Sequence, residues 1–284
     1  MTIFEFIENL KKADLSKVGF NKLLHIIKQN KIRIPYTTAL LKKGTPIERG
    51  RINEDCGFFN SEFEISYRID TGNLKEFGRA NKPFQSRFYG AIPSTDIKYP
   101  RIVLFSELVE QFCEIPIDVF ETTMTIGRWI VKEDFEIADV CFSNDYFNVE
   151  NIKSRYDYWV SETKNTEIGQ KEYQELLSFF SKEFSKTQIK NHFDYKLSCL
   201  YAEIAVYGNG LNGIGYPSVR TDYLANNVAI TPDAVERFLE LKEVGRFRFV
   251  VEKGKPLVFQ THYSDNLGPF NSKFKWEKVR NGSR

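Results

Sequence analysis

The sequence predicts a mixed α+β fold, because helix-like and strand-like patterns both occur along one chain of 284 residues. Apolar side chains recur at helical spacing over residues 2–43 and again over residues 149–206. Between these segments, residues 119–142 alternate apolar and polar side chains, which is typical of half-buried strands. This length suffices to bury a sizeable core in one large domain, or in one domain with an embellishment.

Composition and charge narrow the class of protein. The formal net charge is +2 at pH 7, whereas a general nucleic-acid-binding protein usually shows a basic face and a high pI. A chain whose positive and negative charges nearly cancel can still carry a local basic pocket for one phosphorylated ligand. Aromatic residues make up 15% of the chain, which argues against a disordered tail.

Neither a leader nor a membrane span is expected. The N-terminal segment MTIFEFIENLKK contains acidic residues and has no long apolar core, unlike a signal peptide. No apolar run approaches the roughly 20 residues that a membrane span needs. Four cysteines lie far apart without a CxxC pair, namely Cys56, Cys113, Cys141 and Cys199. We therefore expect buried free thiols in a cytoplasmic protein, with no disulfide framework, zinc site or other metal site.

The helical pattern of residues 2–43 is interrupted by Gly19 and Pro35. We interpret residues 1–44 as an N-terminal helical extension ahead of the main domain. Its apolar stripe is expected to pack in the core, and the alternative is a surface for a partner protein.

The following domain, residues 45–264, carries the candidate functional residues. Residues 63–68 alternate apolar and polar side chains and are predicted to form a half-buried strand. A glycine and a proline near Arg79 predict a turn that presents its side chain. Tyr89 lies in an apolar, strand-like run, and Glu107 lies on a predicted amphipathic helix, close to the buried stripe.

A cation, an aromatic ring and a carboxylate are what a pocket needs to hold a dinucleotide and to break its glycosidic bond. The Arg79 guanidinium can pair with phosphate oxygens in a fork. The Tyr89 ring can stack on a flat base, and the Glu107 carboxylate can bind ribose hydroxyls and stabilise an oxocarbenium-like charge. The alternatives are that Arg79 lies in a solvated turn, that Tyr89 packs as an ordinary strand residue, and that Glu107 lies on the polar side of its helix. Glu110 and Glu114 compete with Glu107 for the role of the acting carboxylate.

The second half of the chain is predicted to add helices, strands and a polar end. The expected segments are strands over 119–142, helices over 149–206 with an insertion at about 150–190, a short strand ending at Ser218, a strand over 226–230, a helix over 232–241, strands over 245–251 and 256–262, and a loosely held polar tail over 265–284. The glycine-rich run over 207–213 follows a helix and precedes a strand. We therefore interpret it as helix capping and a turn, and not as a dinucleotide-binding fingerprint.

Two stretches together resemble the RES domain, a family named for its arginine, glutamate and serine. Residues 78–107 contain an arginine in a turn, then an aromatic strand, then a helix with a glutamate. The run NGIGYPS at residues 212–218 is followed by the strand NNVAI at residues 226–230. The resemblance covers about residues 45–262. It implies an ADP-ribosyltransferase-like fold, with a mixed or antiparallel split sheet and flanking helices.

The resemblance also implies an activity. Several proteins of this family are toxins that consume NAD by phosphorolysis or hydrolysis and are silenced by a cognate antitoxin. NAD would then be a substrate and not a cofactor, with phosphate or water capturing the ADP-ribosyl cation. The implied partner is an antitoxin of the Xre or helix-turn-helix type, with no direct contact to nucleic acid or membrane. The inserted helices at 150–190 would pack in the core, cover the cleft or form a contact in a homo-oligomer.

The family pattern assigns binding roles to further residues of this chain. Arg79 would grip the pyrophosphate, helped by Ser218, whose hydroxyl can donate to a phosphate or ribose oxygen. Arg49 or Arg51 would match the arginine of the first strand of the family, and solvated surface charge is the alternative for both. Asn226 is a further polar candidate. No His/Asp partner supports Ser218 as an activated nucleophile.

Two other functions use the same pocket. The first is an ADP-ribosyltransferase that modifies a macromolecule. The second is a non-catalytic module that binds a nucleotide without turning it over.

Overall fold

The computed structural model describes residues 1–53, 57–109, 119–140, 150–162, 169–252 and 255–279. Within these ranges it contains eight α-helices and ten strands, so the predicted mixed α+β class is confirmed. The chain forms two compact units, each assembled from three segments that are far apart in the sequence. The first unit comprises Met1–Leu40, Asp70–Arg87 and Glu136–Val219, and the second comprises Leu41–Ile69, Phe88–Phe135 and Arg220–Arg284.

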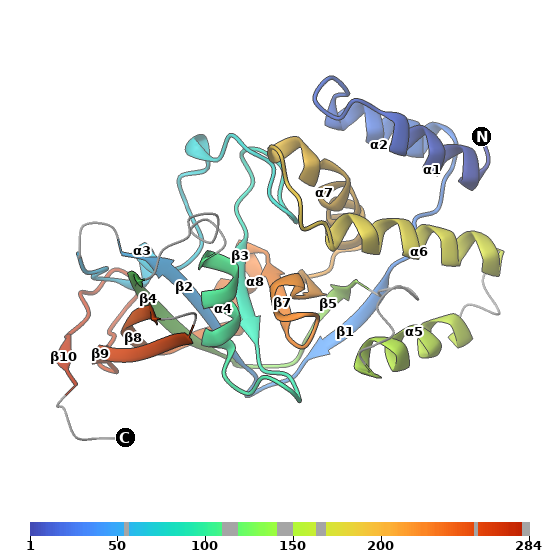
Figure 1. Cartoon of the computed structure of the whole chain (residues 1–284). Coiled ribbons are helices and arrows are strands. Elements are labelled where there is room, and N and C mark those ends of the chain that lie inside the picture. The colour runs from blue at the N-terminus through green and yellow to red at the C-terminus, as the bar shows by residue number, and fades with distance from the viewer. Residues whose placement is uncertain (54–56, 110–118, 141–149, 163–168, 253–254, 280–284) are drawn as a thin grey trace. The chain divides into compact units, whose positions relative to one another are not determined.

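Helices dominate the first unit and strands dominate the second (Figure 1). The first unit holds α1 (Ile3–Lys12), α2 (Phe20–Gln29), α5 (Glu150–Glu162), α6 (Gln170–Phe184), α7 (Lys196–Ala202), β6 (Gly213–Pro217) and, apart from one end residue each, β1 (Thr37–Leu41) and β5 (Phe135–Asp139). The second unit holds β2 (Pro46–Ile52), α3 (Glu62–Ile65), β3 (Phe88–Ile92), α4 (Pro100–Val109), β4 (Val119–Val131), β7 (Asn226–Ile230), α8 (Pro232–Phe238), β8 (Leu239–Glu252), β9 (Lys255–Ser264) and β10 (Glu277–Lys278).

The two N-terminal helices form where the apolar spacing predicts them. Thr2 and Glu5 close a capping box at the start of α1, in which the Glu5 backbone N–H donates to Thr2 Oγ1 at 3.2 Å and the Thr2 N–H donates to Glu5 Oε2 at 2.8 Å. α1 packs against α6, and α2 packs against α7. The apolar stripe of these helices is therefore part of the core of the first unit.

The prediction of helix over residues 2–43 is wrong beyond Gln29, where α2 ends and the chain continues to β1. Pro35 cannot donate a helical hydrogen bond, and the threonines that follow it are β-branched and favour a strand. The Thr37 hydroxyl also donates to the Asp139 carbonyl of β5 at 2.6 Å, which ties β1 to its neighbour. Proline and long-range pairing together override the apolar spacing.

The sheet of the first unit has the order β1-β5-β6, and β5 and β6 run parallel with Ala138 opposite Ile214. The predicted helices of residues 149–206 are confirmed as α5, α6 and α7 in the described ranges. α6 places Phe180 and Phe184 against Tyr201 of α7, with ring centroids 5.0 Å and 5.9 Å apart. The predicted insertion thus packs through an aromatic contact with the helix that leads to β6.

Cys199 in α7 is a free thiol with 1% of its surface exposed, as predicted. Burial, with a smaller contribution from Glu203, raises its pKa to about 12. Because the thiolate is the reactive form, we expect Cys199 to resist iodoacetamide at mildly alkaline pH until urea unfolds the protein. Peptide mass spectrometry measures the labelling of Cys199, and rapid labelling in the folded protein would contradict the prediction.

The other three cysteines, Cys56, Cys113 and Cys141, lie outside the described residues.

The second unit is built on an antiparallel sheet with the order β7-β3-β2-β4-β8-β9-β10. α4 packs on β2 and β3 over a core that includes Ala91, Leu104 and Met124. A Cβ atom at Gly50 would meet Met124 Sδ at 2.5 Å and Leu104 Cδ1 at 3.6 Å, so glycine allows the helix to lie directly on β2. The predicted strand around Tyr89 and the predicted helix of Glu107 are both confirmed.

Two element predictions in the second unit are wrong. Residues 62–65 form the short helix α3 and not a strand. The alternation there is only three apolar residues long, and Phe63 is 46% exposed. The helix predicted over 232–241 ends at Phe238, where β8 begins and pairs with β4. In both places, contacts with distant strands outweigh the local pattern.

The prediction of a loosely held tail over 265–284 is wrong for residues 265–279. Phe274 is 6% exposed, and the Trp276 indole N–H donates to the Phe59 carbonyl at 3.0 Å. β10 then pairs with β9, with Glu277 opposite Tyr263. Buried aromatic side chains anchor this segment although most of its other residues are polar. Among the described helices of the protein, none has the length and apolar character that crossing a membrane requires.

Candidate functional site

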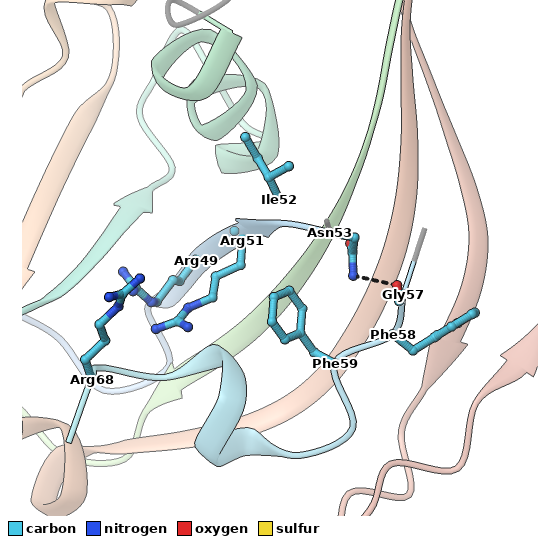
Figure 2. A pocket seen from close by; sticks show the side chains of 9 residues that line it. Arg49, Arg51, Ile52, Asn53, Gly57, Phe58, Phe59 and Arg68 are labelled. Atoms are coloured by element: carbon cyan, nitrogen blue, oxygen red, sulfur yellow. Dashed lines mark hydrogen bonds between the residues drawn. The ribbon is translucent and has the colours of Figure 1, made fainter. Parts of the chain in front are cut away.

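A cavity of about 510 Å³ lies beside β2 in the second unit, and three arginines line it. Arg49 and Arg51 are two residues apart on β2, so strand alternation directs both side chains to the same side. Arg68 follows α3, and Figure 2 shows the three arginine side chains pointing into one region, with the Phe59 ring beside Arg51. The described lining residues are Arg49, Gly50, Arg51, Ile52, Asn53, Gly57, Phe58, Phe59 and Arg68. We call this cavity the arginine pocket.

Backbone carbonyls hold two of the three guanidinium groups in place. Arg49 Nε donates to the Ile65 carbonyl at 3.1 Å, and Arg49 Nη1 donates to the Tyr89 carbonyl at 2.7 Å. Arg51 Nη2 donates to the Ser66 carbonyl at 3.1 Å. Arg49 therefore links β2 to β3 and to the end of α3, and its side chain is ordered before any ligand binds.

The electrostatics of the arginine pocket favour an anion. Burial and the neighbouring Arg51 lower the pKa of Arg49 to about 9, and Arg68 adds to the shift. Burial and Arg68 also lower the pKa of Arg51, and Glu64 opposes part of that shift. None of the nine described lining residues carries a carboxylate. A bound anion would therefore relieve the repulsion among the three guanidinium groups.

Tyr89 lies at the junction of β2 and β3, next to this cluster. Its carbonyl accepts the Arg49 hydrogen bond, and its phenol is close enough to oppose the lowering of the Arg49 pKa. The ring is half-buried. The Tyr89 carbonyl thus contacts Arg49, whereas the Tyr89 side chain lies on the face of Gly50 and α4, opposite to the side chains of Arg49 and Arg51.

Glu107 is half-buried on α4, above the face of β3 that carries Ala91. Its Oε1 accepts a hydrogen bond from Asn227 Nδ2 at 2.8 Å, and Asn227 lies opposite Ala91 in the β3–β7 ladder. Strand alternation places Tyr89 and Ala91 on the same face of β3. The Tyr89 side chain therefore lies on the face of the sheet that α4 and Glu107 cover. Because Asn227 is only 7% exposed, its amide fixes the orientation of the Glu107 carboxylate.

Asn226 was the sequence candidate in β7, but the amide that contacts Glu107 belongs to its neighbour Asn227. Asn226 pairs with Ile92, and alternation turns its side chain to the other face of the sheet. Only the strand register distinguishes these adjacent asparagines. Glu110 and Glu114, which compete with Glu107, lie outside the described residues.

Arg79 and Ser218 belong to the first unit. The predicted turn is confirmed, since the Gly78 N–H donates to the Asn81 carbonyl at 2.9 Å. Arg79 Nη1 donates to the Phe184 carbonyl at the end of α6, and the guanidinium carbon lies 5.2 Å from the Tyr195 ring centroid. Ser218 follows β6 and is fully buried. Convergence of Arg79 and Ser218 with the residues of the second unit stays a prediction.

Sequence reasoning missed Arg68 and the aromatic pair Phe58 and Phe59 of the arginine pocket. Arg68 lay in a segment interpreted as a strand, and the helical turn of α3 changes the direction of the chain there. An arginine within twenty residues of two others is a weak signal by itself. Asn53 also lines the pocket, and its amide donates to the Gly57 carbonyl at 3.0 Å.

No model of a known protein family matches the chain, and no curated protein matches it either. The RES-domain resemblance therefore depends on the residues named above and stays a prediction. Among the described residues, no group of three or more His, Cys, Asp or Glu side chains could hold a metal ion.

Proposed function

We propose that this protein binds NAD through its pyrophosphate and cleaves the nicotinamide–ribose bond by phosphorolysis or hydrolysis. The observation that carries the proposal is the arginine pocket, in which Arg49, Arg51 and Arg68 meet beside Phe59. Tyr89 and Glu107, the residues expected to act on the nicotinamide ribose, belong to the same unit but lie on the face of β2 and β3 opposite to the side chains of Arg49 and Arg51, so NAD would have to reach both faces of the sheet. The split-sheet fold of ADP-ribosyltransferases is part of the same proposal.

The binding step uses the charge of the pocket. A pyrophosphate presents oxygens that two guanidinium forks can engage at once. Arg49 and Arg51 are already anchored to carbonyls, so little side-chain entropy is lost on binding. Phe58 and Phe59 offer flat apolar surfaces on which a base can stack.

The chemical step breaks the bond between C1′ of the ribose and the ring nitrogen of nicotinamide. Nicotinamide leaves with the bonding electron pair, and positive charge develops on C1′ and the ring oxygen. The Glu107 carboxylate, oriented by Asn227, stabilises this charge. A phosphate or water oxygen then forms the new bond to C1′, and water loses its proton to solvent. The Tyr89 ring would stack against the departing nicotinamide.

An enzyme that consumes cellular NAD needs an inhibitor that controls its activity. We therefore propose that the chain is the toxin of a toxin–antitoxin pair, with a helix-turn-helix-type antitoxin that covers the active site. This part of the proposal rests on the resemblance of residues 78–107 and 212–230 to the RES domain.

The test is turnover of NAD by the purified protein, with and without inorganic phosphate, followed by chromatography and mass spectrometry. We expect release of nicotinamide. Phosphorolysis would yield phosphorylated ADP-ribose only when phosphate is present, and hydrolysis would yield ADP-ribose in both conditions. A labelled macromolecule after incubation with lysate would replace the proposal by ADP-ribosyl transfer. Tight NAD binding without nicotinamide release would show instead that the protein is a module that binds NAD and does not cleave it.

A further inference from the structure

Arg68 differs from the other two arginines of the arginine pocket in how its side chain is held. Backbone carbonyls hold Arg49 and Arg51, whereas no hydrogen bond or ion pair with a described residue holds the Arg68 guanidinium. Arg68 is also exposed, and its side chain extends toward the other two arginines (Figure 2). Its N–H donors, which number five in any guanidinium, are therefore available to a ligand.

A bound pyrophosphate leaves the charge of Arg68 without a phosphate partner. Each phosphate of a dinucleotide carries one negative charge, and in the proposed function Arg49 and Arg51 engage these two groups. Burial is the main cause of the lowered pKa of Arg49 and of Arg51, and Arg68 lowers both pKa values further. Glu64 opposes part of that shift at Arg51. A third phosphate beside Arg68 would relieve the repulsion among the three guanidinium groups.

The lining also indicates which part of the ligand carries that phosphate. Phe59 lies beside Arg51 (Figure 2), so a base that stacks on Phe59 places the adenosine ribose between the ring and the arginines. Dinucleotide sites bind the 2′-hydroxyl of NAD with a carboxylate, or accommodate the 2′-phosphate of NADP with an arginine. None of the described lining residues of the arginine pocket carries a carboxylate, and Arg68 is an arginine with available donors.

We propose that Arg68 selects a dinucleotide that carries a phosphate monoester on its adenosine ribose, so that the protein binds NADP in preference to NAD. The inference rests on the proposed function for the class of ligand, and it adds the residue that chooses between the two dinucleotides. A phosphate monoester carries a charge of about −1.5 to −2 and three acceptor oxygens, and a guanidinium can pair with two of them at once. The choice is made at the adenosine half of the ligand and uses only residues of the arginine pocket.

The test compares ADP-ribose with 2′-phospho-ADP-ribose, which differ only in the phosphate monoester. Both lack the nicotinamide–ribose bond, so binding is measured without cleavage, by isothermal titration calorimetry on the wild-type protein. We expect the phosphorylated ligand to bind at least tenfold more tightly, because only its monoester reaches Arg68. Equal affinities, or no measurable binding of either ligand, would overturn the proposal.

The Arg68→Gln variant assigns the preference to one side chain. No described residue depends on the Arg68 guanidinium for a hydrogen bond, so the fold should be retained. We expect 2′-phospho-ADP-ribose to lose at least tenfold in affinity, while the affinity for ADP-ribose stays within about twofold. A folded Arg68→Gln protein that keeps the preference would overturn the proposal.

The Arg248→Gln variant is the matched control. Arg248 lies on β8, pairs with Glu121 at 2.8 Å and does not line the arginine pocket. It also removes one positive charge from the second unit, so it reports any effect of overall charge. We expect this variant to keep the tenfold preference. Loss of the preference in both variants would contradict a specific role of Arg68.

Nicotinamide release from NAD and from NADP is measured in parallel, and it separates this inference from the proposed cleavage. A tenfold preference in binding without any release of nicotinamide would support the role of Arg68 and contradict cleavage. Release of nicotinamide together with equal affinities for the two ligands would support cleavage and contradict the role of Arg68.

Discussion

The Glu107→Gln variant is expected to release nicotinamide from NAD at least about a hundredfold more slowly than the wild-type protein. The substitution removes the negative charge that would stabilise the developing cation, and loss of one such stabilising group typically costs about 10²–10³ in rate. The amide oxygen of the substituted side chain can still accept the hydrogen bond from Asn227, which spans 2.8 Å to Glu107 in this structure. The fold of α4 should therefore be retained, and the loss should appear in kcat.

A matched control is the Glu121→Gln variant, since Glu121 is an exposed glutamate of the same unit. It should cleave NAD at the wild-type rate. Nicotinamide release is followed by chromatography, with circular dichroism as the check on folding. Wild-type kcat in a folded Glu107→Gln protein would remove this residue from the chemistry.

The Arg49→Lys variant is expected to raise KM for NAD about tenfold, which corresponds to about 1.4 kcal/mol of lost binding free energy. Lysine keeps the charge but cannot form a two-pronged contact with phosphate. It also cannot reach both carbonyls that Arg49 bonds, those of Ile65 and Tyr89. The free energy of unfolding should therefore fall as well, by about 1–3 kcal/mol.

Steady-state kinetics and urea unfolding, measured together, separate the two roles of Arg49. Arg248→Lys is the control, because Arg248 is about half exposed on β8 and pairs with Glu121. A lower unfolding free energy with an unchanged KM would restrict Arg49 to a structural role. A loss of kcat at unchanged KM would instead place its contact in the transition state.

Several elements of the site follow from local pattern alone. The apolar run around Tyr89 forms β3, the segment of Glu107 forms α4, and the turn at Arg79 is present. β3 is buried or half-buried along its whole length, as its apolar run predicts. α4 buries Val103 and Leu104 and exposes Ile102, and the turn at Arg79 follows from the glycine and proline beside it. The same reasoning fails at α3, where the apolar pattern is too short to distinguish a strand from a helical turn.

The binding residues themselves depend on which distant segments meet. Arg68 reaches Arg49 and Arg51 only because α3 turns the chain back toward β2. Asn227, and not Asn226, holds Glu107, because the register of β7 against β3 decides which face each asparagine occupies. Strand register is set by pairing between remote segments, so a single sequence does not encode it in any local period.

By itself, therefore, the sequence determined the mixed α+β class and most helices and strands, and it predicted a candidate set of cation, ring and carboxylate. The tertiary structure decided that three arginines share one pocket, that Asn227 orients Glu107, and that Trp276 docks the tail against Phe59. The physical reason is the separation along the chain over which each effect acts. Burial periodicity acts between neighbours along the chain, whereas convergence of charge and strand register arise only when the whole core has closed.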